Sequence, residues 1–331
     1  MLTDTPSAAV PRSKHHVRFH VGSIVLAFIA QLTCDILSIF ALDETVPNAL
    51  FQTSINNVSE SFPIEVTMDI WSNELWFIVV MWCEWWLIAA CYSLCKRGNR
   101  DHCNPEILPP LFYLTWIVVC CAGVGSLILW DRRFVLGAVI LSWIQTLLSF
   151  GMLILSFRNL YRLKTWLFHN DPKRVGWIRY WVQNGLGLYF GWSFLNSLIH
   201  LGIALKYIAG VEDPLVSTII LTILLVCSLV WCFLQSFLLR EYIRYNFTTY
   251  IILILGLAAI CSRGYWHYGF SRNMIYCGCL FLLLIAMSVA QMITLCMCPD
   301  KASGPVAMES RRTFGVSGTV VDTEQHQQNK M

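Results

Sequence analysis

Eight apolar segments constrain this chain most, because each is close to the roughly 20 residues that an α-helix needs to cross a bilayer. Only helices and closed barrels satisfy their backbone hydrogen bonds inside lipid, and segments of this length favour helices. The seventh segment is short, and we expect its transmembrane helix to include residues 242–245 as well. The segments cover residues 21–42, 75–95, 108–130, 134–157, 181–207, 215–239, 247–262 and 273–297. The sequence therefore predicts an all-α, polytopic integral membrane helix bundle with about eight transmembrane helices.

The composition and the cysteine pattern agree with a membrane protein. Of the 331 residues, 13% are charged, whereas soluble domains carry about 25%. The net charge of +3 gives no reason to expect a nucleic-acid partner. Most of the 14 cysteines lie in the apolar segments, where they behave as small hydrophobic side chains. We therefore expect neither a soluble domain nor a disulfide framework.

The distribution of basic residues predicts how the chain is oriented. Eighteen of the 23 Lys and Arg residues fall on the side that carries the N-terminus, and five fall on the other side. Because cytoplasmic loops carry an excess of Lys and Arg, we expect both termini to be cytoplasmic, in the plasma membrane or an endomembrane. The predicted organisation is a cytoplasmic segment (1–20), three helices (21–130) with an acidic extracellular or luminal loop (43–74), a five-helix bundle (131–298) and a disordered cytoplasmic tail (299–331).

Two tripeptides match the acceptor sequence for N-glycosylation, which requires an extracellular or luminal position. The first, beginning at Asn57, lies in the acidic loop. The second begins at Asn246, which the predicted orientation puts at the cytoplasmic edge of a helix. We therefore expect a glycan at Asn57 and none at Asn246.

The segment from Tyr180 to His200 carries more hydrogen-bonding side chains than lipid could satisfy. At 3.6 residues per turn, Gly187 and Gly191 fall on one side of the helix, where a neighbouring helix or a second copy of the chain could pack closely. A second side carries Tyr189, Trp192, Asn196 and His200. The pattern predicts a helix packed on one side and lining a polar, aromatic interior on the other.

Two acidic residues lie inside predicted helices, where a charged group costs roughly 3 kcal/mol or more. Asp35 in the first helix has Gln31 and Ser38 on its own face, and Glu84 lies near the middle of the second helix. His200 is a candidate partner for either acid. Each acid is either a ligand-binding or proton-handling group, or a neutral, hydrogen-bonded carboxyl that ties two helices together.

The 14 tryptophans divide into two groups by their depth in the predicted helices. Those near helix ends fit an aromatic belt at the membrane surface: Trp71, Trp76, Trp130, Trp177 and Trp181. Those that lie deeper could wall a cavity for a flat or apolar ligand: Trp82, Trp85, Trp86, Trp143, Trp192 and Trp231.

Enzyme signatures are not found in the sequence. The G-x-S-x-G, Walker and H-E-x-x-H patterns are absent. We expect the eight histidines to form none of the H-x-x-x-H or H-x-x-H-H clusters of membrane di-metal enzymes. The expected protein is therefore not an enzyme and uses no metal or cofactor.

The residues Leu186-Gly187-Leu188-Tyr189-Phe190-Gly191-Trp192, followed by Asn196, resemble one helix of the tryptophan-rich sensory (translocator-like) membrane proteins. In the longer members of that family a similar helix follows a span that ends in a basic Leu-Tyr-Arg stretch, and Leu160-Tyr161-Arg162 stands in that place here. The resemblance covers roughly residues 134–298. It implies a five-helix bundle around a pocket for tetrapyrroles, sterols or other apolar ligands, in which Tyr189, Gly191, Trp192 and Asn196 match the family helix.

Taken together, these patterns predict a multi-pass membrane protein that senses or binds a small apolar or aromatic ligand inside the bundle. The ligand would be tetrapyrrole- or sterol-like. Trp192, Asn196 and His200 would line the site beside Tyr189, with Glu84 and Asp35 as its ionisable members. The alternatives are an ion-coupled transporter or channel that uses these two acids, and a structural or partner-binding membrane subunit. The expected partners are the lipid bilayer, the ligand and a second copy of the chain joined through Gly187 and Gly191.

Overall fold

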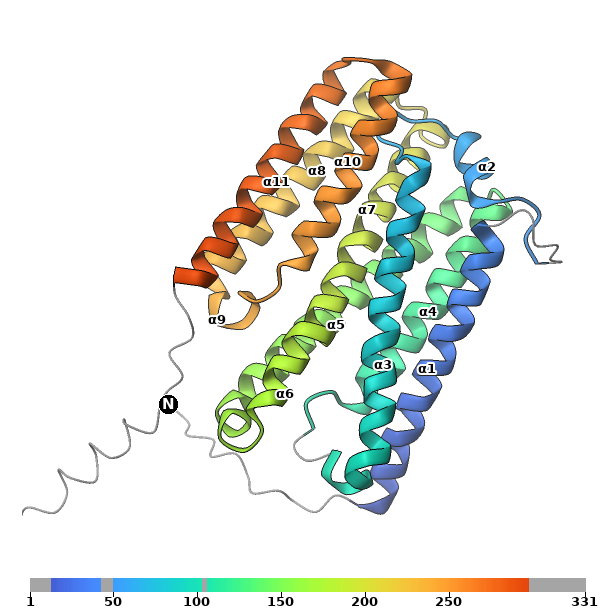
Figure 1. The fold of residues 1–331 in the computed structure, drawn as a ribbon. Coiled ribbons are helices and arrows are strands. Elements are labelled where there is room, and N and C mark those ends of the chain that lie inside the picture. The colour runs from blue at the N-terminus through green and yellow to red at the C-terminus, as the bar shows by residue number, and fades with distance from the viewer. Residues whose placement is uncertain (1–12, 43–49, 103–105, 298–331) are drawn as a thin grey trace, which may run out of the picture. The chain divides into compact units, whose positions relative to one another are not determined.

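A computed structural model describes residues 13–42, 50–102 and 106–297, with side chains described for all of these except 93–102. All regular structure in these residues is helical (Figure 1). Residues up to Met292 form one compact unit, and the chain from Ile293 onward forms a second unit. The whole predicted tail (299–331) and residues 1–12 of the predicted N-terminal segment (1–20) lie outside the described residues.

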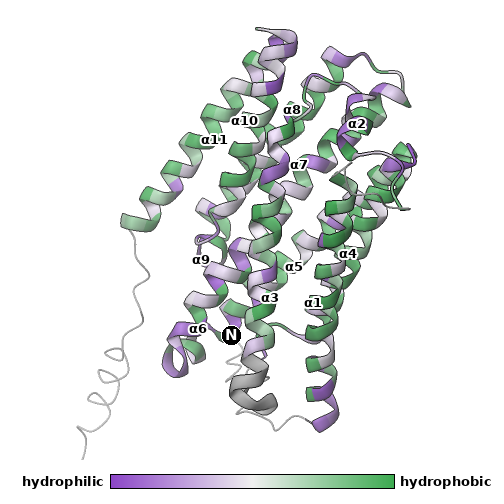
Figure 2. Cartoon of the chain, turned by 45° about the vertical axis from the view of Figure 1, so that its right-hand side comes forward, coloured by the Kyte–Doolittle hydropathy of each residue, from purple (hydrophilic) through white to green (hydrophobic). Residues whose placement is uncertain are grey.

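Eight long helices account for the eight predicted segments, and within the described residues all eight are long and apolar enough to cross a membrane. They are α1 (Lys14–Leu42), α3 (Asn73–His102), α4 (Pro110–Asp131), α5 (Val135–Asn170), α7 (Asn184–Tyr207), α8 (Asp213–Phe233), α10 (Thr248–Tyr268) and α11 (Arg272–Met297). Three short α-helices lie between them: α2 (Ile55–Glu60), α6 (Pro172–Trp177) and α9 (Arg240–Ile243). A short 3-10 helix (Ile70–Ser72) and two π-helical segments (Ile178–Gln183 and Leu234–Leu238) adjoin them or the long helices. Apolar residues follow the long helices in Figure 2, while hydrophilic residues gather toward helix ends and in the short helices. The predicted all-α membrane bundle is confirmed.

Helix ends differ from the prediction at two places. α5 continues past its apolar segment as far as Asn170, so that more than half of the connection between the predicted segments 134–157 and 181–207 is helical. It ends at Asp171, whose side chain accepts the backbone N–H of Arg174 and caps α6. The expectation that the seventh transmembrane helix includes residues 242–245 is wrong. Those residues belong to α9 and to the turn after it, and the seventh transmembrane helix, α10, begins at Thr248.

The start of α10 is set by a residue more than 60 positions earlier in the chain. The side-chain oxygen of Asn184 accepts the backbone N–H groups of Phe247 and Thr248 at 3.2 and 3.4 Å. These are N–H groups at the helix start, which have no partner within the helix. The amide of Asn184 also donates to the backbone carbonyl of Tyr245 at 3.1 Å. Asn184 therefore joins the first turns of α7 and α10.

α7 is the most enclosed helix of the bundle. In the span from Pro172 to Tyr207, 61% of the most apolar stretch is buried, compared with 22–56% in the other long helices. α7 packs against α3, α5, α8 and α10, and it lies between α1, α3 and α4 on one side and α8 and α10 on the other (Figure 1). The polar and small residues of α7 therefore face other helices.

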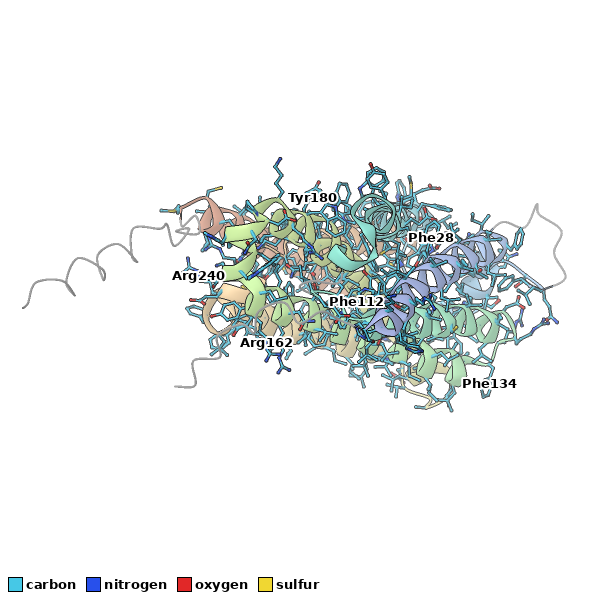
Figure 3. The ribbon with its side chains drawn as sticks, turned by 90° about the horizontal axis from the view of Figure 1, so that it is seen from below. Phe28, Phe112, Phe134, Arg162, Tyr180 and Arg240 are labelled. Atoms are coloured by element: carbon cyan, nitrogen blue, oxygen red, sulfur yellow. The ribbon has the colours of Figure 1, made fainter. Side chains whose placement is uncertain are left out.

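α9 packs against the far end of α5. The Tyr161 hydroxyl donates to Glu241 at 2.9 Å, and the rings of Tyr161 and Tyr242 stack at 4.0 Å between centroids. Figure 3, which views the bundle from below, accordingly places Arg162 and Arg240 on the same side. The basic residues of α5 and α9 thus gather at one end of the bundle, as their assignment to one membrane side predicts.

The glycine side of α7 packs against α10 of the same chain. A Cβ atom at Gly187 would lie 2.5 Å from the side chain of Asn246, and one at Gly191 would collide with Ile252. The close helix packing predicted for this side is therefore present. A homo-oligomer through Gly187 and Gly191 is wrong for this structure, because both glycines are buried and their surface is covered within the chain.

Replacement of Gly191 by leucine tests this contact. We expect Gly191→Leu to destabilise the protein by roughly 1–3 kcal/mol, because the added atoms overlap the side chain of Ile252. Gly151→Leu on α5 is the matched control, since a Cβ atom there meets nothing within 4 Å. Thermal unfolding of the detergent-purified variants measures the difference. Equal midpoints for both variants would show that α7 and α10 do not approach closely here.

The glycosylation site has a direct test. Asn57 is exposed, whereas Asn246 is buried and donates to the backbone carbonyl of Gln183 at 2.8 Å. We expect Asn57→Gln to abolish the mobility shift produced by a glycan-removing enzyme, and Asn56→Gln, which changes no acceptor sequence, to preserve it. A glycan on Asn246 would overturn both the orientation and the packing described here.

Candidate functional site

A cavity of about 150 Å³ lies where α1, α3, α4, α5 and α7 meet, and we call it the central cavity. It is formed by helices from both the first three spans and the later five. Its lining comprises Cys34, Ser38, Leu42, Ile55, Asn73, Trp76, Gly123, Ser126, Leu127, Trp130, Ser142, Gln145, Trp192, Ser193, Asn196 and His200. The cavity therefore combines tryptophan rings with small hydroxyl, amide and imidazole groups.

Two pairs of stacked rings form its aromatic walls. Trp76 of α3 stacks with Trp192 of α7, with 6.4 Å between ring centroids and 28° between planes. Trp130, at the end of α4, stacks on His200, with a centroid distance of 4.5 Å and an angle of 22°. Each pair joins α7 to a helix of the first three spans. The ring contacts thus hold the imidazole of His200 in a defined orientation.

Three polar atoms in the lining are buried and have no hydrogen-bond partner: Ser38 Oγ, Ser193 Oγ and His200 Nδ1. Buried polar groups in folded proteins are nearly always hydrogen-bonded, and an isolated one costs roughly 1–3 kcal/mol. Nearby polar groups are already engaged, since Asn196 donates to the carbonyl of Trp192 at 3.1 Å. The lining of the central cavity therefore holds three polar groups whose hydrogen bonding the described residues leave unsatisfied.

A second, smaller cavity adjoins the central one on the side of residues 50–74. It has a volume of about 90 Å³ and shares five lining residues with the central cavity: Ile55, Asn73, Trp130, Asn196 and His200. Its remaining lining includes Glu60, Asp69 and Arg263. Asn196 and His200 therefore lie between the central cavity and a charged opening on the side predicted to be extracellular or luminal.

The two intramembrane acids form a separate cluster. Asp35 and Glu84 lie close enough to each other to interact electrostatically. The amide of Gln31 donates to both carboxylate oxygens of Asp35 at 2.8 and 3.0 Å, which confirms that these residues share a face of α1. The side-chain oxygen of Gln31 accepts the indole N–H of Trp116 at 3.0 Å. This cluster joins α1, α3 and α4.

The six ligand-site residues predicted from the sequence are therefore divided between three places. Trp192, Asn196 and His200 line the central cavity. Tyr189 is buried beside it, and its hydroxyl accepts the amide of Gln145 at 2.7 Å. Asp35 and Glu84 do not line the cavity, and His200 is not their partner, because it stacks on Trp130 while the two acids contact each other.

The tryptophan assignment needs correction. Trp76 and Trp130 were expected in an aromatic belt, but both wall the central cavity. Trp85, expected to wall a cavity, is exposed on the helix surface and packs against Trp181. A signal for the first two exists in the sequence: Asn73 lies three residues before Trp76, and Ser126 lies four before Trp130, so each tryptophan shares a helix face with a polar residue.

A further cavity of about 300 Å³ lies between α5, α7, α8 and α10, and we call it the aromatic pocket. The rings that line it belong to Trp143, Phe150, Phe190, Phe194, Trp231 and Tyr250. Ser228 Oγ and Trp231 Nε1 are buried in its wall without a hydrogen-bond partner. Of the deeper tryptophans predicted to wall a cavity, Trp143 and Trp231 do so here, and Trp192 does so in the central cavity.

Comparisons of the chain with protein-family models, with curated proteins and with solved structures found no match. The fold itself defines the class: a multi-pass α-helical membrane protein. Within the described residues it has eight helices long and apolar enough to span a membrane and a polar, aromatic cavity where five of them meet.

Proposed function

We propose that this protein binds a small, uncharged aromatic or heterocyclic molecule in the central cavity. One observation carries the proposal: three buried polar atoms without partners belong to residues that line a cavity walled by three indole rings. Flat apolar walls with a few well-placed polar groups are the usual composition of small-molecule sites. Stacked tryptophans provide the contact area, and the three polar atoms would select the ligand by hydrogen bonding.

The cavity volume sets the size of this ligand. A cavity of about 150 Å³ accommodates a single aromatic ring such as benzene. Sites for drug-sized molecules begin at about 300 Å³, so a tetrapyrrole or sterol exceeds the central cavity. The larger apolar ligand implied by the family resemblance fits the aromatic pocket better, because that pocket is twice as large and almost entirely apolar.

The stacked pair of Trp130 and His200 would orient the ligand. The imidazole ring is held by the indole, so that Nδ1 can hydrogen-bond a ligand without losing further side-chain freedom, and such preorganisation favours affinity. Its position beside the charged outer cavity would place the entrance on the side predicted to be extracellular or luminal. Asn196, which lines both cavities, would lie on that entry route.

Two buried serines distinguish the two cavities experimentally. Ser193 lines the central cavity and Ser228 the aromatic pocket, and neither hydroxyl has a partner. We expect Ser193→Leu to abolish binding of single-ring heterocycles and to leave sterol binding unchanged. Ser228→Leu should have the opposite effect, because each leucine fills only its own cavity. Quenching of tryptophan fluorescence in purified protein measures the first ligand class, and a radiolabelled sterol measures the second.

Each variant is the control for the other, since both replace a buried serine in a membrane helix. Loss of both ligand classes in both variants would indicate general unfolding, which thermal unfolding midpoints would reveal. If a well-folded Ser193→Leu protein still binds single-ring heterocycles, the central cavity is excluded as their binding site.

The contact between Asp35 and Glu84 favours a second candidate function, proton-coupled transport. Two neighbouring carboxylates repel each other, so that a proton on one of them is favoured. Along α1, however, the stretch between His20 and Gln31 rises roughly 16 Å, and its buried face there consists of Ser23, Ile24 and Ala27. Any polar path from the acids would therefore be closed on the side predicted to be cytoplasmic in this conformation.

Proton flux into reconstituted vesicles tests the transport candidate. If the acids carry protons, Glu84→Gln should lose the pH-dependent flux reported by an entrapped pH indicator. Glu74→Gln, at the exposed start of the same helix, should keep it. Absence of flux in the wild type would exclude this candidate, and absence of both flux and ligand binding would leave a structural or partner-binding subunit.

A further inference from the structure

A histidine and carboxylate cluster lies at the other end of α1 from the central cavity. His20 Nδ1 lies 3.1 Å from Glu106 Oε1, and His16 Nε2 lies 3.4 Å from the same oxygen. One donor atom from each of the three residues lies within 4.8 Å of the others. The expectation that the histidines form no H-x-x-x-H pair is wrong, because His16 and His20 have this spacing and share one face of α1.

Local packing brings the third residue to this pair. Glu106 lies four residues before Pro110, the first residue of α4, and α4 packs along α1. The imidazole of His20 is only 2% exposed and lies 5.7 Å, between ring centroids, from the buried ring of Tyr113. Glu106 is likewise largely buried, with 9% of its side chain exposed. Two of the three groups are therefore fixed by the fold and not free on a surface.

The spacing of the donors matches the coordination shell of a metal ion. Protein nitrogen and oxygen ligands bind Zn²⁺ at about 2.0–2.2 Å in tetrahedral geometry, which places neighbouring donors about 3.3 Å apart. The two distances to Glu106 Oε1, 3.1 and 3.4 Å, lie on either side of this value. Two imidazoles and one carboxylate are also a common ligand set for zinc, with one coordination position left open.

We propose that His16, His20 and Glu106 bind a divalent transition-metal ion, for which Zn²⁺ is the best match. Imidazole suits transition metals, whereas Mg²⁺ and Ca²⁺ prefer oxygen ligands alone. The site lies away from the central cavity and does not depend on the function proposed for it. The competing explanation is an ion pair between protonated histidines and Glu106, which needs no metal.

The site also has a route for the ion. His20 and Glu106 line a cavity of about 590 Å³ on the side predicted to be cytoplasmic. Water in this cavity would fill the open coordination position, and the ion would enter through it. Besides Glu106, the charged residues of this lining are Asp171, Lys173 and Arg174. Two acidic and two basic side chains leave the lining without a net formal charge, so that selective binding of a cation would depend on the histidine nitrogens.

Zinc titration of purified full-length protein tests the proposal. After removal of metal with EDTA, we expect wild type to bind one equivalent of Zn²⁺, measured by competition with a chromogenic chelator. His20→Ala and Glu106→Gln should weaken binding by more than about tenfold, since even changes outside the first shell cost 10–100-fold. His15→Ala is the matched control, because His15 lies on the same turn of α1 but is exposed. It should bind as the wild type does.

Two results would overturn the proposal. One is a wild-type protein that binds no zinc. The other is zinc binding that is equally tight in His20→Ala and in wild type, which would assign the ion to cysteines elsewhere. Because a variant can fail to fold, Co²⁺ bound to the wild type gives an independent measurement. Nitrogen and oxygen ligation gives tetrahedral d–d absorption without the sulfur charge-transfer band, and a strong sulfur band would contradict the assignment.

Discussion

Lipid offers no hydrogen bonds, and this constraint decides how the helices of this protein are turned. Its effect is clearest at Asn184, whose side chain hydrogen-bonds both to its own helix and to the first turn of α10. Gln31 has the same role between α1 and α4, where it links Asp35 to Trp116. Each of these residues satisfies groups on two helices at once. Polar residues thus fix which helices are neighbours, and apolar packing then fills the space between them.

α7 is the helix on which most of these constraints meet. Its glycine side allows α10 to approach closely, and its aromatic side faces α1, α3, α4 and α5 across the central cavity. The stacked pairs Trp76–Trp192 and Trp130–His200 connect the first three helices to α7. The central cavity therefore depends on helices from both parts of the chain. A five-helix bundle without the first three spans would lack Ser38, Trp76 and Trp130.

Properties that repeat along one helix could be predicted from the sequence. The eight membrane helices, the shared face of Gln31 and Asp35, and the faces of α7 all follow from segment length and a 3.6-residue period. Contacts between distant helices could not be predicted in this way. Helical periodicity predicts that Asp35 and Glu84 face the interior of the bundle. It does not predict that these two acids lie close to each other or that His200 stacks on Trp130.

The same limit applies to helix ends and to the zinc site. The start of α10 depends on Asn184, which no local pattern near Thr248 reveals. The H-x-x-x-H spacing of His16 and His20 is visible in the sequence, but their third ligand lies more than 80 residues away. Proximity to helix ends predicts a position at the membrane surface for Trp76 and Trp130, whereas their rings turn into the bundle.

The central claim is that the polar side of α7 faces an internal, water-accessible cavity and not lipid. Thiol labelling in vesicles tests this claim most directly, because water-soluble thiosulfonates react with thiolates and these form only in water. In a parent chain with Cys34, which also lines the cavity, replaced by serine, Ser193→Cys should add a labelled site. Leu229→Cys, on the exposed face of α8 and outside the lining of both cavities, should add none. Labelling at Leu229→Cys and not at Ser193→Cys would contradict the account.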